Sequence, residues 1–319
     1  MGLSAAPASP VAAERAPLDP VLVDFARDVG AEGPVAVEGR RTRWDAGGAL
    51  ASGTRLVRAP TGVVEHRPEE MTVRVRAGTP VVELHELLAG AGQRSALPER
   101  DGTVGGALAV GEAHLCALGR GLLRDAVLQV RYVSADGRVV TGGGPTVKNV
   151  SGYDLPRLLV GSLGTLGLLA EAVLRTQPLP AAAVWLRAEG VDAFAVRDAL
   201  YDPAAVLTDG AATWVCLEGH PGDVDAESQL LRRLGAWREV DGPPPLPPRR
   251  WSLPPAELRH LDRESTGGHL ASVGLGVVYA NQPPPVRPAT VALADLRRRL
   301  RDAFDPAGRL APGREPGRR

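Results

Sequence analysis

The chain has 319 residues, of which 44% are hydrophobic and 23% are charged, a composition typical of a globular protein long enough for two domains. Lys plus Arg and Asp plus Glu each total 37, so the formal net charge is zero and no basic excess can neutralise a nucleic-acid backbone. These numbers exclude a disordered chain and argue against binding of nucleic acid.

The cysteines and the apolar stretches bear on the cellular compartment. Cys116 and Cys216 match neither a disulfide framework nor a zinc motif, so a reducing cytoplasm is expected. The longest uncharged apolar stretch, residues 158–170, is too short and too rich in glycine to span a bilayer. Residues 1–17 lack the basic and apolar regions of a signal peptide and are expected to form a disordered tail.

Residues 18–179 are expected to form a first domain of the α+β class. Helical spacing of apolar residues predicts a helix from Leu18 to Gly30, and alternation predicts strands over residues 34–39 and 71–77. The remaining elements expected in this domain are a helix over residues 80–89 capped by Thr79, a hairpin of strands over 126–134 and 138–141, a short helix over 154–160, and a strand over 166–176.

The elements after Pro180 follow the order strand, helix, strand, strand, helix, strand, which is the order of a ferredoxin-like domain. The strands are expected from Ala183 onward and over residues 205–207, 213–218 and 236–240, and the helices over residues 191–200 and 224–234. A proline-rich linker over 241–250 and a last strand over 271–280 complete this domain, residues 180–289. Residues 290–319 are expected to add a closing helix and a C-terminal tail.

Glycine-rich segments are the strongest chemical signal in the chain. Residues 142–171, GGGPTVKNVSGYDLPRLLVGSLGTLGLLAE, hold seven glycines, which allow backbone N–H groups to approach a phosphate closely. Neither a Rossmann GxGxxG fingerprint nor a Walker lysine is present. The glycine loop at residues 102–111 and the arginine loop at residues 39–42 could contact the same anion. The alternative is a set of glycine turns beside solvated arginines.

Lys148 stands out because it is the only lysine, and its neighbour Asn149 is one of two asparagines. The rarity of both residue types favours a chemical role for the Lys148 ammonium and the Asn149 amide. The alternative is that both are exposed loop residues without such a role. His114 and Cys116 form an H-x-C pair with no further ligand nearby in sequence, so no metal site is expected. The sequence has no hydrolase signature.

Five segments resemble a family of flavoproteins, in the same order along the chain. They are VRVRAGTPVVELHELLAGAGQ, GTVGG, LLRDAVLQVRYVSADGRVVTGGG, VKNVSGYDLPRLLVGSLGTLG and FDPAGRLAPGR, and the resemblance covers residues 21–314. The family is that of vanillyl-alcohol oxidase and p-cresol methylhydroxylase (PCMH), which includes the FAD-binding subunit of glycolate oxidase. The resemblance implies an α+β fold, in which a PCMH-type FAD-binding domain of two α+β subdomains precedes a ferredoxin-like cap domain.

The resemblance also implies which residues bind FAD. The pyrophosphate loop would comprise Gly39, Arg40, Arg41, Thr42 and Arg43. The second flavin loop would comprise Thr103, Gly105 and Gly106, and the third would comprise Gly161, Ser162, Gly164, Thr165 and Gly167. The motif before the third loop would supply Lys148, Asn149, Gly152, Tyr153 and Asp154. Family members usually carry consecutive glycines where this chain has Arg40 and Arg41, and related dehydrogenases carry a histidine cluster in the cap that this chain lacks.

The expected function is that of a cytoplasmic FAD-binding oxidoreductase subunit that works with partner oxidase subunits on a small 2-hydroxy acid. FAD, bound non-covalently, would carry the redox chemistry, and Lys148 would place positive charge near the reduced flavin. Any contact with a membrane would come through a partner subunit. No catalytic residue can be assigned. The alternatives are a complete FAD-dependent dehydrogenase of a hydroxy acid or sugar, and a flavin-free scaffold.

Overall fold

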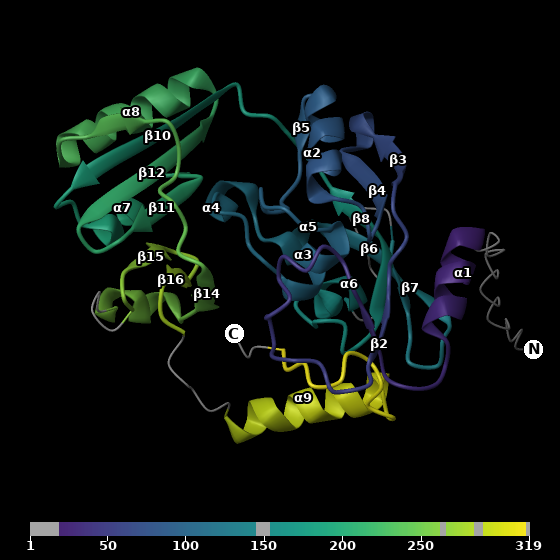
Figure 1. Ribbon diagram of the computed structural model, residues 1–319. Helices are drawn as coiled ribbons and strands as arrows, with labels where there is room; N and C mark the ends of the chain where they lie inside the picture. The colour runs from purple at the N-terminus through teal and green to yellow at the C-terminus, as the bar shows by residue number, and fades with distance from the viewer. Residues whose placement is uncertain (1–18, 145–153, 262–265, 284–289, 317–319) are drawn as a thin grey trace, which may run out of the picture.

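The computed structural model describes residues 19–144, 154–261, 266–283 and 290–316, which form two units side by side (Figure 1). The N-terminal unit, residues 19–178, is built on a five-stranded sheet, and the cap, residues 182–280, on a seven-stranded sheet. The yellow helix α9 (Val291–Phe304) lies along the lower edge of the N-terminal unit in the figure.

The five-stranded sheet is antiparallel throughout and has the strand order β3-β4-β8-β6-β7. Its strands are β3 (Val63–Arg67), β4 (Thr72–Arg76), β6 (Val127–Val133), β7 (Val139–Gly143) and β8 (Leu168–Arg175). The central strand β8 is buried at every residue except Arg175. Such a continuous buried run is what a strand covered on both faces requires.

Short helices and two small sheets cover this central sheet. The helices are α1 (Pro20–Val29), η1 (Pro68–Glu70), α2 (Val81–Gly90), α3 (Val104–Val110), α4 (Ala117–Arg120), α5 (Leu123–Ala126) and α6 (Leu155–Leu159). The small sheets pair β1 (Val35–Val37) with β2 (Arg55–Val57), and β5 (Gln93–Arg94) with β9 (Gln177–Pro178). Leu22, Leu84 and Leu108 bring three of the helices into one hydrophobic core with the sheet.

The helices and strands predicted for this unit are present with shifted ends, but the predicted helix cap is wrong. The N-cap of α2 is Pro80, which makes no side-chain capping bond. The Thr79 hydroxyl instead accepts a hydrogen bond from the Gly62 N–H at 2.9 Å and donates one to the Gly62 carbonyl at 3.2 Å. The Thr79 side chain thus bonds to Gly62, distant in sequence, and not to the first turn of α2 as the sequence predicted.

The cap contains the predicted ferredoxin-like order of elements. They are β10 (Ala182–Glu189), α7 (Ala193–Ala199), β11 (Ala205–Thr208), β12 (Ala212–Gly219), α8 (Pro221–Leu234) and β13 (Arg238–Val240). Their strands pair in the order β13-β10-β12-β11. Val196 of α7 and Leu231 of α8 share one hydrophobic cluster with Val215 of β12, so both helices pack on the same face of the sheet. The cap sheet then continues beyond β11.

This continuation differs from the sequence prediction in two places. The single strand predicted over residues 271–280 is a hairpin of β15 (His269–Ser272) and β16 (Val277–Ala280). Gly276 makes the turn possible, because it has a φ of +72° and a Cβ there would lie 2.1 Å from the Leu253 carbonyl oxygen. The expected linker over 241–250 ends in the sheet, since β14 (Arg249–Ser252) pairs with β16. The short 3-10 helix η2 (Pro255–His260) follows β14.

The C-terminal segment ties the N-terminal unit together. Leu310 forms a parallel bridge with Val35, beside strand β1. The buried guanidinium of Arg309 donates hydrogen bonds of 2.8–3.1 Å to four backbone carbonyls, those of Val29, Glu32, Gly33 and Ala135. One side chain therefore holds the end of α1, the start of β1 and the β6–β7 turn. Among the described residues no helix has the length and apolarity needed to cross a membrane.

Replacing Arg309 with Met should lower the free energy of unfolding by about 3 kcal/mol, because four carbonyls lose a charged donor. Urea denaturation of the two proteins measures the difference. The matched control is Arg297→Met, at an exposed position of α9, which should change stability by less than about 0.5 kcal/mol. Equal effects at the two positions would contradict the structural role of Arg309.

Candidate functional site

Three loops and the C-terminal segment surround a cavity in the N-terminal unit. The loops are residues 39–44 after β1, residues 103–106 at the start of α3, and residues 163–168 before β8, and Ala311 and Arg314 complete the wall. We refer to this space as the first cavity.

The structure brings most of the site residues expected from the sequence to this cavity. Those that line it are Gly39, Arg40, Arg41, Thr42, Arg43, Thr103, Gly105, Gly106, Gly164 and Gly167. Gly161 lines a neighbouring second cavity. Lys148, Asn149, Gly152 and Tyr153 lie outside the described residues. Contact of any of these residues with FAD stays a prediction.

Three of the expected site residues serve the local structure instead. Ser162 and Thr165 are buried, and the Thr165 hydroxyl donates a hydrogen bond of 2.7 Å to the Ser162 carbonyl. Asp154 is the N-cap of α6 and accepts a hydrogen bond of 3.1 Å from the Arg157 N–H. None of the three lines either cavity.

Backbone donors in the loop after β1 are free to bind a ligand. The Glu38 N–H donates to the Val57 carbonyl at 2.8 Å and the Trp44 N–H donates to the Arg41 carbonyl at 3.3 Å. Between them, the N–H groups of residues 39–43 make no hydrogen bond to any group in the described part of the chain. Consecutive backbone donors of this kind form a concave site for an anion, and the Thr42 hydroxyl adds a further donor.

The second glycine loop, residues 103–106, shapes the cavity wall but offers no free N–H groups at residues 104–106. The N–H groups of Val104, Gly105 and Gly106 already donate to the Thr79 carbonyl, the Ala77 carbonyl and the Thr103 hydroxyl, at 2.9, 2.7 and 3.1 Å. A Cβ on Gly105 would lie 2.9 Å from the Ala77 oxygen, so glycine is required for α3 to pack on the end of β4. This packing leaves the space that becomes the cavity.

Backbone strain is concentrated at the same place. Four non-glycine residues of the described chain have positive φ, and three of them, Arg41 (57°), Leu163 (56°) and Ala311 (43°), line the first cavity. The fourth is Met71. A left-handed conformation costs a non-glycine residue roughly 1–2 kcal/mol, and such strain tends to cluster at ligand sites. Of the two arginines that replace family glycines, only Arg41 takes the glycine-like conformation.

Carboxylates hold the arginines of this loop in place. Arg43 and Glu112 form an ion pair in which only 6% and 5% of the two side chains are exposed. The Arg43 guanidinium also donates to the Asp101 carbonyl at 2.9 Å. Arg40 lies 3.0 Å from the Asp101 carboxylate, and Arg41 pairs with Glu38. Arg43 therefore fixes the loop, whereas Arg40 and Arg41 are the more exposed cations.

Trp44 anchors the other end of the loop. The guanidinium carbons of Arg41 and Arg314 each lie 5.0 Å from a Trp44 ring centre. Arg314 is buried, which lowers its pKa, and it donates to the Ala46 carbonyl at 2.6 Å. The loop is thereby connected to the C-terminal segment as well as to α3.

These features fit the adenine dinucleotide FAD. The free N–H groups of residues 39–43 match a pyrophosphate, and the apolar wall of Ala109, Val110 and Leu168 suits aromatic rings. None of the described residues that line the first cavity is a histidine or a cysteine, the side chains that would form a covalent flavin link. The cofactor would be held by non-covalent contacts.

A second cavity adjoins the first and shares residues 41–44 of the loop with it. Its wall includes two acidic residues, Asp45 and Glu112, and five arginines: Arg41, Arg43, Arg100, Arg249 and Arg250. The last two come from β14 of the cap. Sequence reasoning missed the contribution of the cap because it placed both arginines in a linker, and only the strand pairing brings them to this position.

Arg250 is the most distinctive group of the second cavity. It lies opposite Tyr279 in the pairing of β14 with β16. Its Nε is buried and has no hydrogen-bond partner among the described residues. Burial raises the pKa of Tyr279, so this phenol stays protonated at neutral pH. A guanidinium with one nitrogen that lacks a partner among the described residues is suited to bind a carboxylate.

Backbone strain at Arg41 can be measured by comparing two substitutions. Arg41→Gly and Arg41→Ala both remove the contacts with Glu38 and Trp44, but only glycine relieves the positive φ. The glycine variant should therefore be more stable than the alanine variant by about 1 kcal/mol in urea denaturation. At Arg40, which has no positive φ, alanine should be the more stable of the two. The same order at both positions would contradict the assignment of strain to Arg41.

Comparison with known proteins finds an FAD-binding family and several similar oxidoreductases. Residues 22–143 match the family described as FAD binding domain. Glycolate oxidase subunit GlcE of Escherichia coli is 33% identical over 214 residues, which cover 62% of this chain and 59% of the subunit. Glycolate oxidase subunit GlcD of Bacillus subtilis is 41% identical over 95 residues, 29% of this chain and 20% of that subunit. The D-lactate dehydrogenase of Archaeoglobus fulgidus is 47% identical over 76 residues, 24% of this chain and 17% of the enzyme.

The chain thus spans about three fifths of the GlcE subunit and smaller parts of the other two relatives. The fold is also that of solved structures. An alkyldihydroxyacetonephosphate synthase superposes with a TM-score of 0.64 at 14% sequence identity, over 91% of this chain and 73% of that one. Residues 22–143 thus match an FAD-binding domain, and the chain is similar to glycolate oxidase subunits GlcE and GlcD.

Proposed function

We propose that this protein is an FAD-dependent oxidoreductase subunit that takes part in the oxidation of a small 2-hydroxy acid. The observation that carries the proposal is the pair of adjoining cavities, one with free backbone donors for a pyrophosphate and one rich in arginine. The names of the relatives, glycolate oxidase subunits and a D-lactate dehydrogenase, support the same substrate class.

In this proposal the chain's own residues do three things. The N–H groups of residues 39–43 and the Thr42 hydroxyl bind the FAD pyrophosphate, while Arg43 and Glu112 keep the loop in position. Arg250 binds the carboxylate of the hydroxy acid in the second cavity. Lys148 places positive charge near the flavin, as the sequence motif suggests. When bound, FAD supplies the two-electron acceptor for the alcohol.

Partner subunits belong to the proposal because two of the relatives are named as subunits of glycolate oxidase. We place the protein in the cytoplasm, with any membrane contact made through a partner. The cap arginines favour a second candidate, a dehydrogenase that is complete in this chain, because they supply a carboxylate site without a partner. Turnover of glycolate by the purified chain with a dye acceptor, compared with the chain coexpressed with oxidase subunits, separates the two candidates.

FAD should copurify with the protein and should leave it on acid precipitation, because no histidine or cysteine among the described residues lines the first cavity. The absorption spectrum of the supernatant and of the pellet measures this. Flavin that stays in the pellet would contradict non-covalent binding. A folded, colourless protein that does not take up added FAD would overturn the proposed function.

Arg250→Met should weaken the binding of oxalate, a two-carbon analogue of glycolate, by about tenfold or more, since a charge-assisted hydrogen bond is lost. The change in flavin absorption during an oxalate titration measures the affinity, and the FAD content of each variant shows whether the cofactor site is intact. Arg232→Met, at an exposed position of α8, is the control and should bind oxalate like the parent protein. Unchanged affinity in Arg250→Met would remove Arg250 from the substrate site.

A further inference from the structure

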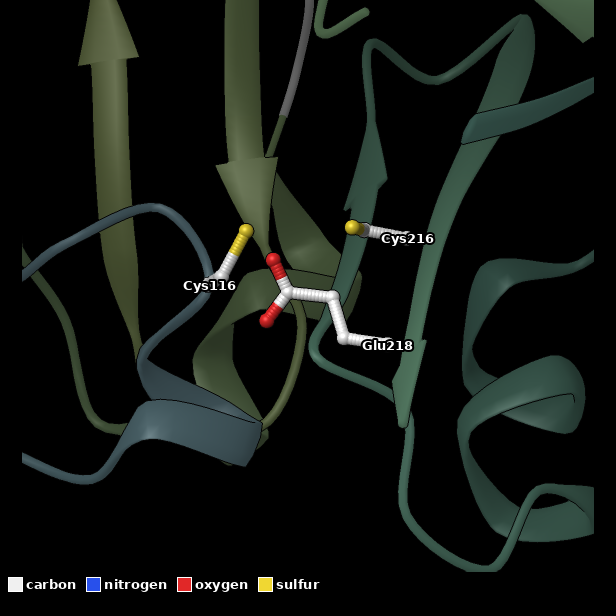
Figure 2. A group of neighbouring side chains, drawn as sticks. All are labelled: Cys116, Cys216 and Glu218. Carbon is white, nitrogen blue, oxygen red and sulfur yellow. The ribbon is translucent and has the colours of Figure 1, made fainter. Parts of the chain in front are cut away.

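The two cysteines of the chain meet at the junction between the N-terminal unit and the cap (Figure 2). Cys116 is the N-cap residue of α4, and Cys216 lies in β12 of the cap. Their sulfur atoms and a carboxylate oxygen of Glu218 all lie within 4.8 Å of one another. Only 4% of Cys116 and 1% of Cys216 is exposed. The fold has joined two residues that are far apart in sequence.

Close packing holds the two cysteines in this position. A Cβ on Gly119 of α4 would lie only 3.1 Å from the Ala204 Cα, so the backbones of the two units are nearly in contact beside the cysteines. Glu218 of the cap also forms buried ion pairs with Arg94 at 2.5 Å and with Arg120 at 2.9 Å. Both guanidiniums belong to the N-terminal unit. The distance between the thiols is therefore set by the interface and not by one mobile side chain.

The charges around the pair favour a thiolate at Cys116. A hydrogen bond from the Cys216 thiol lowers the pKa of Cys116, and His114 acts in the same direction. The hydrogen bond with Cys116 correspondingly raises the pKa of Cys216. Cys116 is therefore the better nucleophile of the two.

A metal ion would be a poorer occupant of this cluster. The Glu218 oxygens already accept from Arg94 and Arg120, and ion pairing with these cations outweighs burial and lowers the Glu218 pKa. Two guanidiniums next to the carboxylate oppose a further cation and stabilise an anion. A thiolate beside a thiol is instead the arrangement from which a disulfide forms.

We propose that Cys116 and Cys216 form a reversible disulfide that links the FAD-binding unit covalently to the cap when a peroxide is present. The Cys116 thiolate attacks a peroxide oxygen, the O–O bond breaks, and hydroxide or an alkoxide leaves, which gives a sulfenic acid. The Cys216 thiol then attacks the Cys116 sulfur, an S–S bond forms and water leaves. The thiols lose two electrons and the peroxide gains them. A small dithiol reverses the reaction by thiol–disulfide exchange.

The consequence of this bond would be a cap that cannot move relative to the FAD-binding unit. Neither cysteine lines the first or the second cavity, so the bond would act on the junction and not on the flavin or the substrate. It would close a long loop between residues 116 and 216, and cross-links that close long loops restrict the unfolded chain most.

The test uses the full chain, because a chain with only two cysteines can form only one intramolecular disulfide. Purified protein is incubated with hydrogen peroxide, denatured and labelled with a maleimide. The number of free thiols per chain should fall from two to none and return to two after dithiothreitol, with no dimer on non-reducing gels. The melting temperature of the oxidised protein should rise on the order of 5 °C.

Two cysteine variants identify the order of the steps. Cys216→Ser should accumulate a Cys116 sulfenic acid that a dimedone probe labels, whereas Cys116→Ser should resist the same dose of peroxide. The wild-type thiol count decides the matter even where a variant does not fold. Two thiols that survive peroxide, a disulfide between two chains, or a stoichiometric metal ion bound by the reduced thiols would each overturn the proposal.

Discussion

The buried ion pair between Arg43 and Glu112 fixes the loop that separates the two cavities. Removal of one partner from such a pair typically costs about 3–5 kcal/mol, because the remaining charge is left without compensation in a dry environment. The pair links residues 69 positions apart, from the loop after β1 to the segment after α3. With the loop held at this point, the neighbouring N–H groups of residues 39–43 stay free for a ligand instead of folding back on the protein.

The loop after β1 also connects the FAD-binding unit with the cap, because it lines both cavities. Residues 41–44 line both cavities, and Arg249 and Arg250 of the cap line the second. In the proposed function a cofactor and a small acid would therefore bind in adjoining cavities that share this loop. This arrangement depends on the position of the cap. The ion pairs of Glu218 with Arg94 and Arg120, buried between the units, hold the cap there. In the proposed function the acid site therefore relies on this interface, whereas the first cavity is lined by the N-terminal unit and the C-terminal segment.

The sequence predicts local structure well and long-range structure poorly in this protein. Hydrophobic periodicity identifies most strands of the two larger sheets but misses β3 and β14, and the glycine segments identify loops that converge on one cavity. The turn at Gly276 lies within a run of apolar residues, so the sequence predicts one strand where the structure has a hairpin. The contribution of Arg250 and the meeting of Cys116 with Cys216 depend on strand order and on the packing of two units, which no local pattern encodes.

A crystal structure of the FAD-loaded protein would show whether the free N–H groups after β1 bind the pyrophosphate of FAD, as we propose. We expect pyrophosphate oxygens within about 3.2 Å of backbone nitrogens in residues 39–43. Arg43 should remain paired with Glu112 in that structure. Phosphates bound elsewhere, with these N–H groups facing solvent, would rule out the proposed role of the loop.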